Sequence, residues 1–558
     1  MATTPGDYDQ QFAIVDADAS PVTVVYGYWQ IPAVSAPPIY NGTTTVGAYT
    51  VSNGMQGLFC SGHCWLPDGR LFIVGGDDWS AHITHPYADF TGSRMVAIYD
   101  PMLGATGTWL TGPQLVASQN SPVPFLVQPR WYPTALVTVD SAVTTPAVKV
   151  VVFGGIEQAV FNPPTGLVGN GVFLASDRSY LTHEAFDVVA PNSTWNNVTI
   201  SKDGRTGGVL PAVSGTPAQV GGLFLGTTTS PPMMPNFPFG YSLFYYGRAH
   251  YLSNAVFGGG PAYVNGVSWI GGMPVGSVWI DHPVDANLWP TPQPLLTTVT
   301  DIIDEPTAVL LPASLSGGGS DRIALFGGQL GLNSTMPPSP ITNLVHLLDA
   351  KLLSPSWSTT AMPPMNHARK FANSVLLPDS SVLIVGGGIN GATGGKGGEV
   401  YTPEVFRGTT WQDGPPETSP RTYHSTSLLL PSGRVVSMGG DTRRWDMQVY
   451  QPHYWQAGTT RPVVASAPSA LTYGSDFVVT FTLTPGRTLA KASLTTPGSV
   501  THSHDPNQRL VELAINSSNS TSATLLAPAD PTKAPYGHYM LWLVDSAGEV
   551  SAAVWTRL

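Results

Sequence analysis

One frame recurs along most of this chain: an apolar strand, a polar turn, a second apolar strand and a pair of glycines. Its copies end at Gly76, Gly155, Gly328, Gly387 and Gly440, with a looser copy that ends at Gly260 or Gly272. The last copies lie 59 and 53 residues apart, close to the period of about 50 residues in kelch repeats. Strand-rich repeats of this length predict a β-propeller, and the strands before Cys60 would complete a seventh blade.

The composition agrees with short strands joined by many turns. The chain has 558 residues, of which 60 are glycine and 52 proline, and its aromatic content of 10% argues against disorder. The net charge of −11, without any basic run, argues against a nucleic-acid partner. No apolar run reaches the roughly 18 residues that a membrane span needs. We therefore predict an all-β protein whose main unit is a seven-bladed kelch-type β-propeller.

The pattern changes after about residue 456. The segments from there to the end show alternating apolar residues and frequent turns, without paired glycines. About 100 residues of this kind predict an immunoglobulin-like β-sandwich. The expected domains are thus 1–455, the propeller, and 456–558, the sandwich. A polar loop in the second domain, THSHDPNQR, contains His502 and His504.

Three of the repeats are preceded by residues that can bind metal or carry out redox chemistry. Cys60 lies before the first copy, Tyr132 lies in the segment RWYP before the second, and Tyr423 and His424 precede the last. Equivalent positions in successive blades face the same end of the channel, so these residues are expected to converge. Because neighbours on a regular strand point to opposite faces, Tyr423 and His424 can share a site only if the backbone bends there.

The motifs FCSG, RWYP, RTYHS and VTHS-x-x-x-x-QR together resemble the galactose oxidase and glyoxal oxidase family of copper radical oxidases. In that family two tyrosines and two histidines hold one copper ion, and one tyrosine ring is bonded to a cysteine sulfur. The resemblance implies that the metal ligands are Tyr132, Tyr423, His424 and His502. It implies a thioether between Cys60 and Tyr132, with the radical on Tyr132 and Tyr423 as the catalytic base. Imidazole and oxygen ligands suit Cu(II).

Several other residues allow more than one interpretation. His504 is the second choice at the position of His502, and an independent metal site at His82 and His85 competes with an ordinary polar loop. Cys64 and His63 are expected to be structural. Trp131 could line the pocket or fill the core, and Arg369 could contact substrate or serve the blade.

The resemblance implies two-electron oxidation of a small aldehyde, as its hydrate, or of a primary alcohol, with reduction of O2 to H2O2. Glu157 stands where galactose oxidase has a stacking tryptophan, and no arginine that would grip galactose is evident, so a glyoxal oxidase-like substrate range is expected. The alternatives are a galactose oxidase-like carbohydrate oxidase and a non-catalytic kelch protein that binds glycans or matrix proteins.

The compartment is inferred from short sequence signals. Six Asn-x-Ser/Thr sequons favour a secreted glycoprotein, and the leader is expected to be absent from this chain; the sequons begin at Asn41, Asn192, Asn197, Asn333, Asn516 and Asn519. A monomer is expected. A peroxidase that consumes the H2O2 is a candidate partner.

Overall fold

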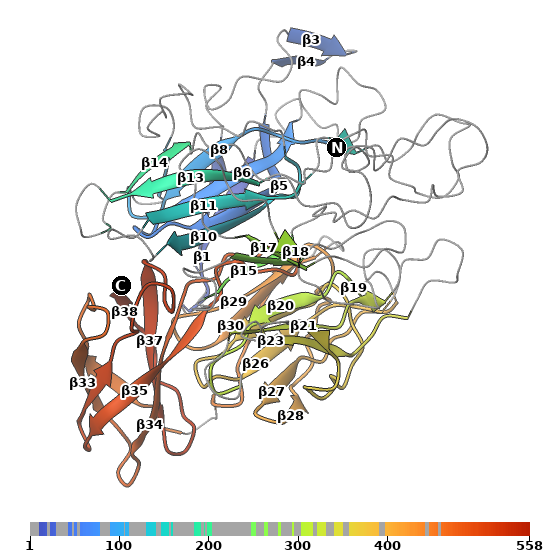
Figure 1. The fold of residues 1–558 in the computed structure, drawn as a ribbon. Coiled ribbons are helices and arrows are strands. Elements are labelled where there is room, and N and C mark those ends of the chain that lie inside the picture. Colours follow the sequence, from blue (N-terminus) through green and yellow to red (C-terminus); the bar gives the residue numbers. More distant parts are fainter. Residues whose placement is uncertain are drawn as a thin grey trace.

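The structure is a computed structural model, and Figure 1 shows its course from the N-terminal strands to the C-terminal sheet. It describes residues 10–18, 23–29, 43–46, 49–52, 56–78, 90–104, 107–110, 130–140, 147–155, 158–159, 183–190, 195, 198–202, 247–252, 262–265, 277–280, 293–294, 303–315, 321–330, 340–349, 357–389, 397–440, 446–455 and 459–558. Within these ranges the regular structure consists of strands, as predicted, and no helix long and apolar enough to cross a membrane occurs.

Each of the five regular copies of the frame forms the first two strands of a separate antiparallel sheet, in a propeller-like arrangement, and the looser copy that ends at Gly260 or Gly272 lies outside the described residues. Among the described residues, five such sheets have four strands and the last has three. The four-stranded sheets begin with β5 (Gln56–Trp65) and β6 (Leu71–Asp78), β10 (Thr134–Asp140) and β11 (Ala147–Phe153), β15 (Arg248–Tyr251) and β16 (Ala262–Asn265), β20 (Thr307–Leu310) and β21 (Arg322–Phe326), and β25 (Asn373–Leu376) and β26 (Val382–Val385). The three-stranded sheet contains β29 (Ser425–Leu429), β30 (Val435–Gly439) and β31 (Met447–Tyr450).

The outer strands complete the sheets. They are β8 (Val96–Asp100) and β9 (Thr108–Leu110), β13 (His183–Val189) and β14 (Thr199–Lys202), β17 (Ser277–Ile280) and β18 (Gln293–Pro294), β23 (Val345–Asp349) and β24 (Trp357–Ser358), and β27 (Glu404–Arg407) and β28 (Thr410–Asp413). Two-stranded pairs are formed by β1 (Gln10–Asp16) with β2 (Thr23–Trp29), β3 (Thr43–Val46) with β4 (Tyr49–Ser52), β7 (Phe90–Thr91) with β12 (Gln158–Ala159), and β19 (Ile303–Asp304) with β22 (Gln329–Leu330).

The paired glycines that define the repeat mark places where one blade touches the next. Gly75 and Gly386 both have φ of 69°, in the left-handed region that favours glycine. A Cβ on Gly75 would lie 2.4 Å from the carbonyl oxygen of Arg130, and one on Gly386 would lie 2.3 Å from that of Arg421. Any side chain would therefore push the next blade away, which explains why the glycines recur with the blade period.

Three buried arginines fix the same junctions. Arg130, Arg369 and Arg421 each donate a hydrogen bond to a carbonyl in the glycine pair of their own blade, at 2.5 to 3.2 Å, and each pairs with a carboxylate of a neighbouring segment. The acceptors are Gly154, Gly386 and Gly439, and the carboxylates are Glu184, Glu404 and Asp446. A buried guanidinium paired in this way orients the turn and the following strand together.

The C-terminal strands form one continuous seven-stranded sheet around its own core. Its order is β32-β33-β36-β35-β34-β37-β38, with bounds Val463–Ser466, Asp476–Thr482, Ser522–Leu526, Leu510–Ser518, Leu489–Thr495, His538–Asp545 and Val554–Arg557. Strand β35 pairs with β34 through its first half and with β36 through its second. Residues such as Val479, Leu494 and Leu541 fill the space enclosed by this folded sheet.

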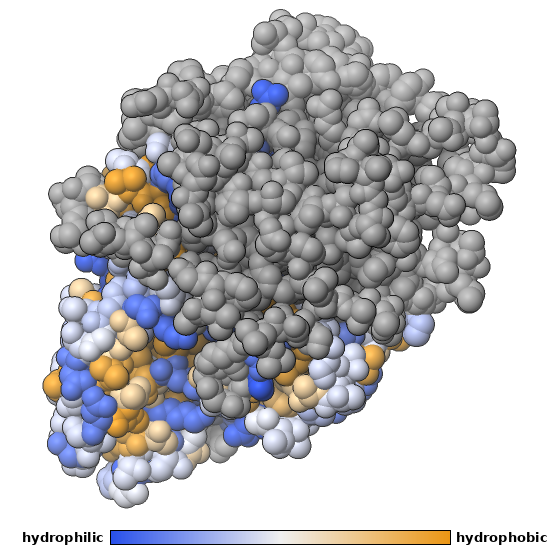
Figure 2. Space-filling view, viewed as in Figure 1, coloured by the Kyte–Doolittle hydropathy of each residue, from blue (hydrophilic) through white to orange (hydrophobic). Residues whose placement is uncertain are grey.

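The C-terminal sheet packs directly on the blades. Trp542 of β37 belongs to the same buried cluster as Val375 of β25 and Val435 of β30. Ser493 of β34 donates a hydrogen bond to the carbonyl of Pro378 at 2.8 Å. In the space-filling view, hydrophilic and hydrophobic residues are interspersed over the described part of the visible face (Figure 2). The shared core places the loop between β34 and β35 against the inner strands of the propeller.

Candidate metal centre

The backbone bends at the residues that the sequence singled out. Cys60, Tyr132, His424 and His502 have φ of 59°, 63°, 65° and 47°. Residues other than glycine rarely adopt this left-handed conformation, and where they do the surrounding structure must hold it in place. Three of these bends come just before or within the first strand of a blade, and the fourth lies at the tip of the loop between β34 and β35. The bend expected at Tyr423 and His424 is confirmed.

The bend turns two neighbouring side chains toward one site. The rings of Tyr423 and His424 lie 3.8 Å apart between centroids, at 35° to each other. Phe371, just before β25, also packs against Tyr423, with ring centroids 4.9 Å apart. On a regular strand the two rings would point to opposite faces, so this close pair exists only because His424 has a positive φ.

Residues from four distant segments meet at this point. The hydroxyl oxygens of Tyr132 and Tyr423 are 2.7 Å apart, and the sulfur of Cys60 lies 3.9 Å from Nε2 of His502. The sulfur of Cys60 and one nitrogen each of His424 and His502 lie within 4.8 Å of one another. Tyr132 also donates its backbone N–H to the carbonyl of Cys60 at 3.0 Å. The convergence predicted from the repeat is therefore confirmed.

His502 reaches this cluster on a tightly braced loop. Thr501 and His504 exchange two backbone hydrogen bonds of 2.9 Å, which close the tip that carries His502. The buried carboxylate of Asp505 accepts hydrogen bonds from the backbone N–H groups of Ser499, Asn507 and Gln508 at 3.0 to 3.1 Å. Such internal bonding lets a polar loop enter the interior without unsatisfied backbone groups.

The propeller holds the same loop from several sides. Trp65 at the end of β5 donates its indole N–H to the carbonyl of Gly498 at 2.8 Å. The side chain of Gln508 donates to the carbonyl of Ser374 in β25 at 3.0 Å. His504 accepts a hydrogen bond from the backbone N–H of Ala249 in β15 at 3.3 Å, so it faces away from the cluster. Of the two histidines in the loop, His502 is the one that joins Cys60 and the tyrosines.

The surroundings favour a neutral, oriented imidazole at His502. Burial, followed by the nearby His424, Arg248 and His63, holds the pKa of His502 well below its ordinary value. Its Nδ1 lies 2.8 Å from the hydroxyl of Thr501, which leaves Nε2 on the side of Cys60. A neutral imidazole with one nitrogen engaged by a polar partner is the form that binds metals.

Two residues close to the candidate metal centre were not identified from the sequence. Glu305 and Phe371 also have positive φ, 50° and 58°, and each lies two residues before the first strand of its blade, as Tyr132 does. The backbone N–H of Phe371 donates to the carbonyl of Glu305 at 3.2 Å. The carboxylate of Glu305 forms a buried ion pair of 3.1 Å with Arg248. The same count of two residues before the first strand of each repeat would have identified both positions.

The remaining candidates have structural surroundings. Arg369 is fully buried and forms an ion pair of 2.6 Å with Glu404. Its side chain therefore stabilises its own blade and does not contact a substrate. Cys64 is fully buried in an apolar cluster, and Cys60 and Cys64 are not joined by a disulfide. Trp131 is buried with its ring 4.1 Å from that of Tyr132. His82, His85 and Glu157 lie outside the described residues.

Family models match the second half of the chain. Residues 345–454 match the glyoxal oxidase N-terminus, and residues 461–558 match the galactose oxidase-like early set domain. The first segment contains Tyr423 and His424, and the second contains His502. These matches confirm the resemblance to the galactose oxidase and glyoxal oxidase family that the motifs indicated.

Individual proteins with oxidase names are also similar to this chain. The chain is 30% identical over 251 residues to galactose oxidase from Gibberella zeae, which is 42% of this chain and 36% of that protein. It is 28% identical over 230 residues to the aldehyde oxidase GLOX from Vitis pseudoreticulata, which is 37% of this chain and 43% of that protein. The chain thus spans less than half of the length of these relatives.

A solved structure extends the similarity of fold to most of the chain. It is a fungal alcohol oxidase with catalytic diversity in complex with copper, matched at a TM-score of 0.58 and 20% sequence identity. The match covers 91% of this chain and 88% of the other. The described sheets therefore share their arrangement with the fold of that solved structure.

Proposed function

We propose that this chain is a copper radical oxidase whose metal ligands are Tyr132, Tyr423, His424 and His502. The observation that carries the proposal is the convergence of two phenol oxygens 2.7 Å apart with two imidazoles and a thiol. Nitrogen and oxygen donors of this kind suit Cu(II), so the donor set fits the metal. The oxidase names of the relatives from Gibberella zeae and Vitis pseudoreticulata support the same class.

The protein-derived half of the cofactor would be a thioether between Cys60 and Tyr132. The two residues are adjacent at the centre, because Tyr132 donates its backbone N–H to the carbonyl of Cys60. A copper ion held there would supply one-electron redox chemistry, and the sulfur-substituted ring of Tyr132 would provide the second oxidising equivalent. The ring would be held in orientation by Trp131, which packs on it.

Tyr423 would act as the base toward the substrate hydroxyl. Its oxygen lies 2.7 Å from that of Tyr132, and Phe371 and His424 both pack against its ring. A free phenol has a pKa of about 10, so a cation must stabilise the phenolate before it can take a proton near neutral pH. Packing by the two rings would keep the oxygen directed toward the substrate.

The net reactions balance with O2 as the oxidant. A primary alcohol, R–CH2OH, would be oxidised to R–CHO while O2 is reduced to H2O2. An aldehyde hydrate, R–CH(OH)2, would be oxidised in the same way to the carboxylic acid. Each reaction removes two electrons and two protons from the substrate and transfers both pairs to O2.

The proposal also covers the number of blades, the two domains and the location of the protein. Residues 1–455 would form a seven-bladed kelch-type propeller that carries most of the copper site. Residues 456–558 would form an immunoglobulin-like sandwich that contributes His502. We further propose a secreted, glycosylated monomer whose H2O2 is available to a peroxidase; of the six sequons, Asn516 and Asn519 lie on the exposed surface of the described residues.

The preferred substrates would be small aldehydes or simple primary alcohols, as for glyoxal oxidase. The argument rests on Glu157 in place of a stacking tryptophan and on the absence of an evident sugar-gripping arginine in the sequence. A galactose oxidase-like preference is the second candidate, favoured by the relative from Gibberella zeae.

The test is a comparison of kcat/KM for methylglyoxal, glycerol, benzyl alcohol and galactose, read as H2O2 from copper-loaded protein. We expect the small aldehyde or a simple alcohol to exceed galactose. Tyr423→Phe, which removes one oxygen, should lower kcat by at least about a hundredfold. Tyr454→Phe is the matched control, because that buried hydroxyl only donates to the carbonyl of Gly433. No peroxide with any substrate would refute an oxidase, and preference for galactose would refute the substrate assignment alone.

A further inference from the structure

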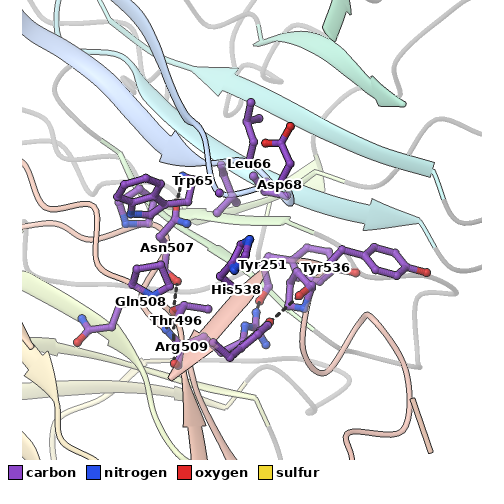
Figure 3. Close-up of a pocket in the computed structure, with 18 of the residues that line it drawn as sticks. Trp65, Leu66, Asp68, Tyr251, Thr496, Asn507, Gln508, Arg509, Tyr536 and His538 are labelled. Carbon is purple, nitrogen blue, oxygen red and sulfur yellow. Dashed lines mark hydrogen bonds between the residues drawn. The ribbon is translucent and has the colours of Figure 1, made fainter. Parts of the chain in front are cut away.

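A cavity lies between the propeller and the C-terminal sheet. Its volume is about 710 Å³, and none of the residues of the candidate metal centre lines it. Figure 3 shows residues from both parts of the chain around it. The blades contribute Trp65 at the end of β5, Leu136 within β10 and Leu310 at the end of β20, among others. The C-terminal part contributes Tyr536, just before β37, and Tyr539 of β37. Cavities of this size at domain junctions, with mainly apolar and aromatic walls, are typical binding sites for small molecules.

A buried cation lines this cavity. Arg509 is only 8% exposed, and its guanidinium donates hydrogen bonds to the carbonyls of Lys533, at 3.0 Å, and Tyr251. Within the part of the chain that the structure describes, no carboxylate lies within 4.0 Å of it. Neutral carbonyls satisfy hydrogen bonds but do not compensate a positive charge, and burying a charge without a counter-ion is costly.

The other polar groups of the cavity do not supply that counter-ion. The carboxylate of Asp68 is bonded to Arg70 at 2.7 Å and accepts a hydrogen bond from the backbone N–H of Val198. Burial, followed by Arg509 and Arg248, lowers the pKa of His250 to about 3, so His250 is neutral. Burial and Arg557 also lower the pKa of His538. The cavity therefore combines apolar walls with one cation that lacks a carboxylate partner.

We propose that this cavity binds a small organic monocarboxylate, with its carboxylate paired to Arg509 and its alkyl or aromatic body against the aromatic and aliphatic walls. An anion at Arg509 would form a charge-assisted bond in a desolvated setting, where such bonds are strong. The apolar body would occupy the space bordered by Trp65, Leu136 and Tyr536, which a purely inorganic anion would leave unfilled. The site does not depend on the oxidase activity proposed above.

The test compares two probes of equal length on the purified full chain by isothermal titration calorimetry. Octanoate carries the charge and octanamide does not. We expect octanoate to bind with one site per chain and at least tenfold more tightly than octanamide. Absence of octanoate binding, or equal affinity for the two probes, would overturn the proposal.

Two variants locate the site. Arg509→Met should remove the preference for octanoate, and Val137→Trp should fill the cavity and abolish the binding of octanoate, because Val137 lines it. Val478→Trp, on the exposed face of β33, is the matched control and should bind octanoate normally. Arg509 also links two segments through its hydrogen bonds, so the affinity of Arg509→Met counts as a test only if this variant unfolds cooperatively. If it does not, the affinity of Val137→Trp for octanoate is the test. Unchanged octanoate affinity in folded Val137→Trp would contradict the proposal.

Discussion

The hydroxyl oxygens of Tyr132 and Tyr423 lie 2.7 Å apart although 291 residues separate them in the sequence. Each tyrosine precedes the first strand of its own blade, and each belongs to a bend, at Tyr132 itself and at His424. Only the closing of the sheets around a common centre brings the two together. The candidate centre is therefore a property of the whole arrangement rather than of one segment.

The first prediction concerns the bond between Cys60 and Tyr132. Incubation of the purified chain with Cu(II) and O2 should form the thioether, because sulfur and ring would both lie at the metal. The intact mass should then fall by two hydrogens, and a peptide that joins the two residues should survive reduction. The measurement is mass spectrometry of the intact and the digested protein.

Cys64 provides the internal control for that experiment. It lies in the same strand but is fully buried in an apolar cluster, and burial raises the pKa of its thiol. Alkylation after unfolding should label Cys64 alone in the treated sample and both cysteines in the untreated one. Recovery of Cys60 as a thiol from an active sample would rule the bond out.

The second prediction tests the blade arginines. Arg369→Met should destabilise the protein by about 3–5 kcal/mol, because it leaves the fully buried Glu404 without its charge partner. Arg322→Met removes a partly exposed pair with Asp349 and should cost about 1 kcal/mol or less. Urea unfolding of both variants measures the difference. Similar losses for the two would show that Arg369 is not part of the blade framework.

The third prediction concerns the loop that carries His502. Asp505→Ala removes the acceptor of three backbone hydrogen bonds and should weaken Cu(II) binding about tenfold or more, although no ligand is changed. Asp476→Ala, which removes an exposed partner of Asn516 in the same sheet, is the control. Competition with a copper chelator gives the affinities. Equal affinity in Asp505→Ala and wild type would show that the loop does not need this brace.

The fourth prediction is a pH dependence at the junction of the two parts. Burial alone would raise the pKa of Asp379, but the hydrogen bond from His453, 2.7 Å long, and the hydroxyl of Ser381 lower it overall. A carboxyl whose pKa is lower in the folded protein than in the unfolded chain stabilises the fold at any pH above its unfolded-state pKa of about 3.9. This contribution is lost as the pH falls through the folded-state pKa.

Asp379→Asn should therefore lower Tm at pH 7 and have progressively less effect below pH 4. Thermal unfolding of wild type and variant from pH 7 to pH 2.5 provides the comparison. Asp530→Asn, in a half-buried turn of the C-terminal part where Asp530 accepts hydrogen bonds from Thr532, serves as a control for general acid effects. A difference that stays constant over the whole range would contradict the assignment.

Much of the architecture was predictable because it follows from local patterns. The paired glycines identify the blades, since a Cβ at Gly75 or Gly386 would collide with the next blade. The bend at His424 was predictable because two chemically active neighbours could not otherwise face one site. The division of the chain near residue 456 stays a prediction, which rests on the loss of the glycine pairs there.

Other features depend on contacts that no local pattern reveals. Whether Arg369 contacts a substrate or Glu404 is decided by which side of the blade its guanidinium faces, and the sequence is the same in both cases. Glu305 carries no recognisable motif, and its pairing with Arg248 joins residues 57 positions apart. The cavity at Arg509 arises only where the C-terminal sheet meets the blades.

The central claim is that residues from both parts of the chain together bind one copper ion. The most direct measurement is the copper content after loading and exhaustive dialysis of wild type, His502→Ala and the control His367→Ala, whose histidine is exposed and pairs with Asp413. We predict one copper per chain in wild type and in His367→Ala, and none in His502→Ala. Full copper content in His502→Ala, or a wild type that retains no copper, would contradict the account.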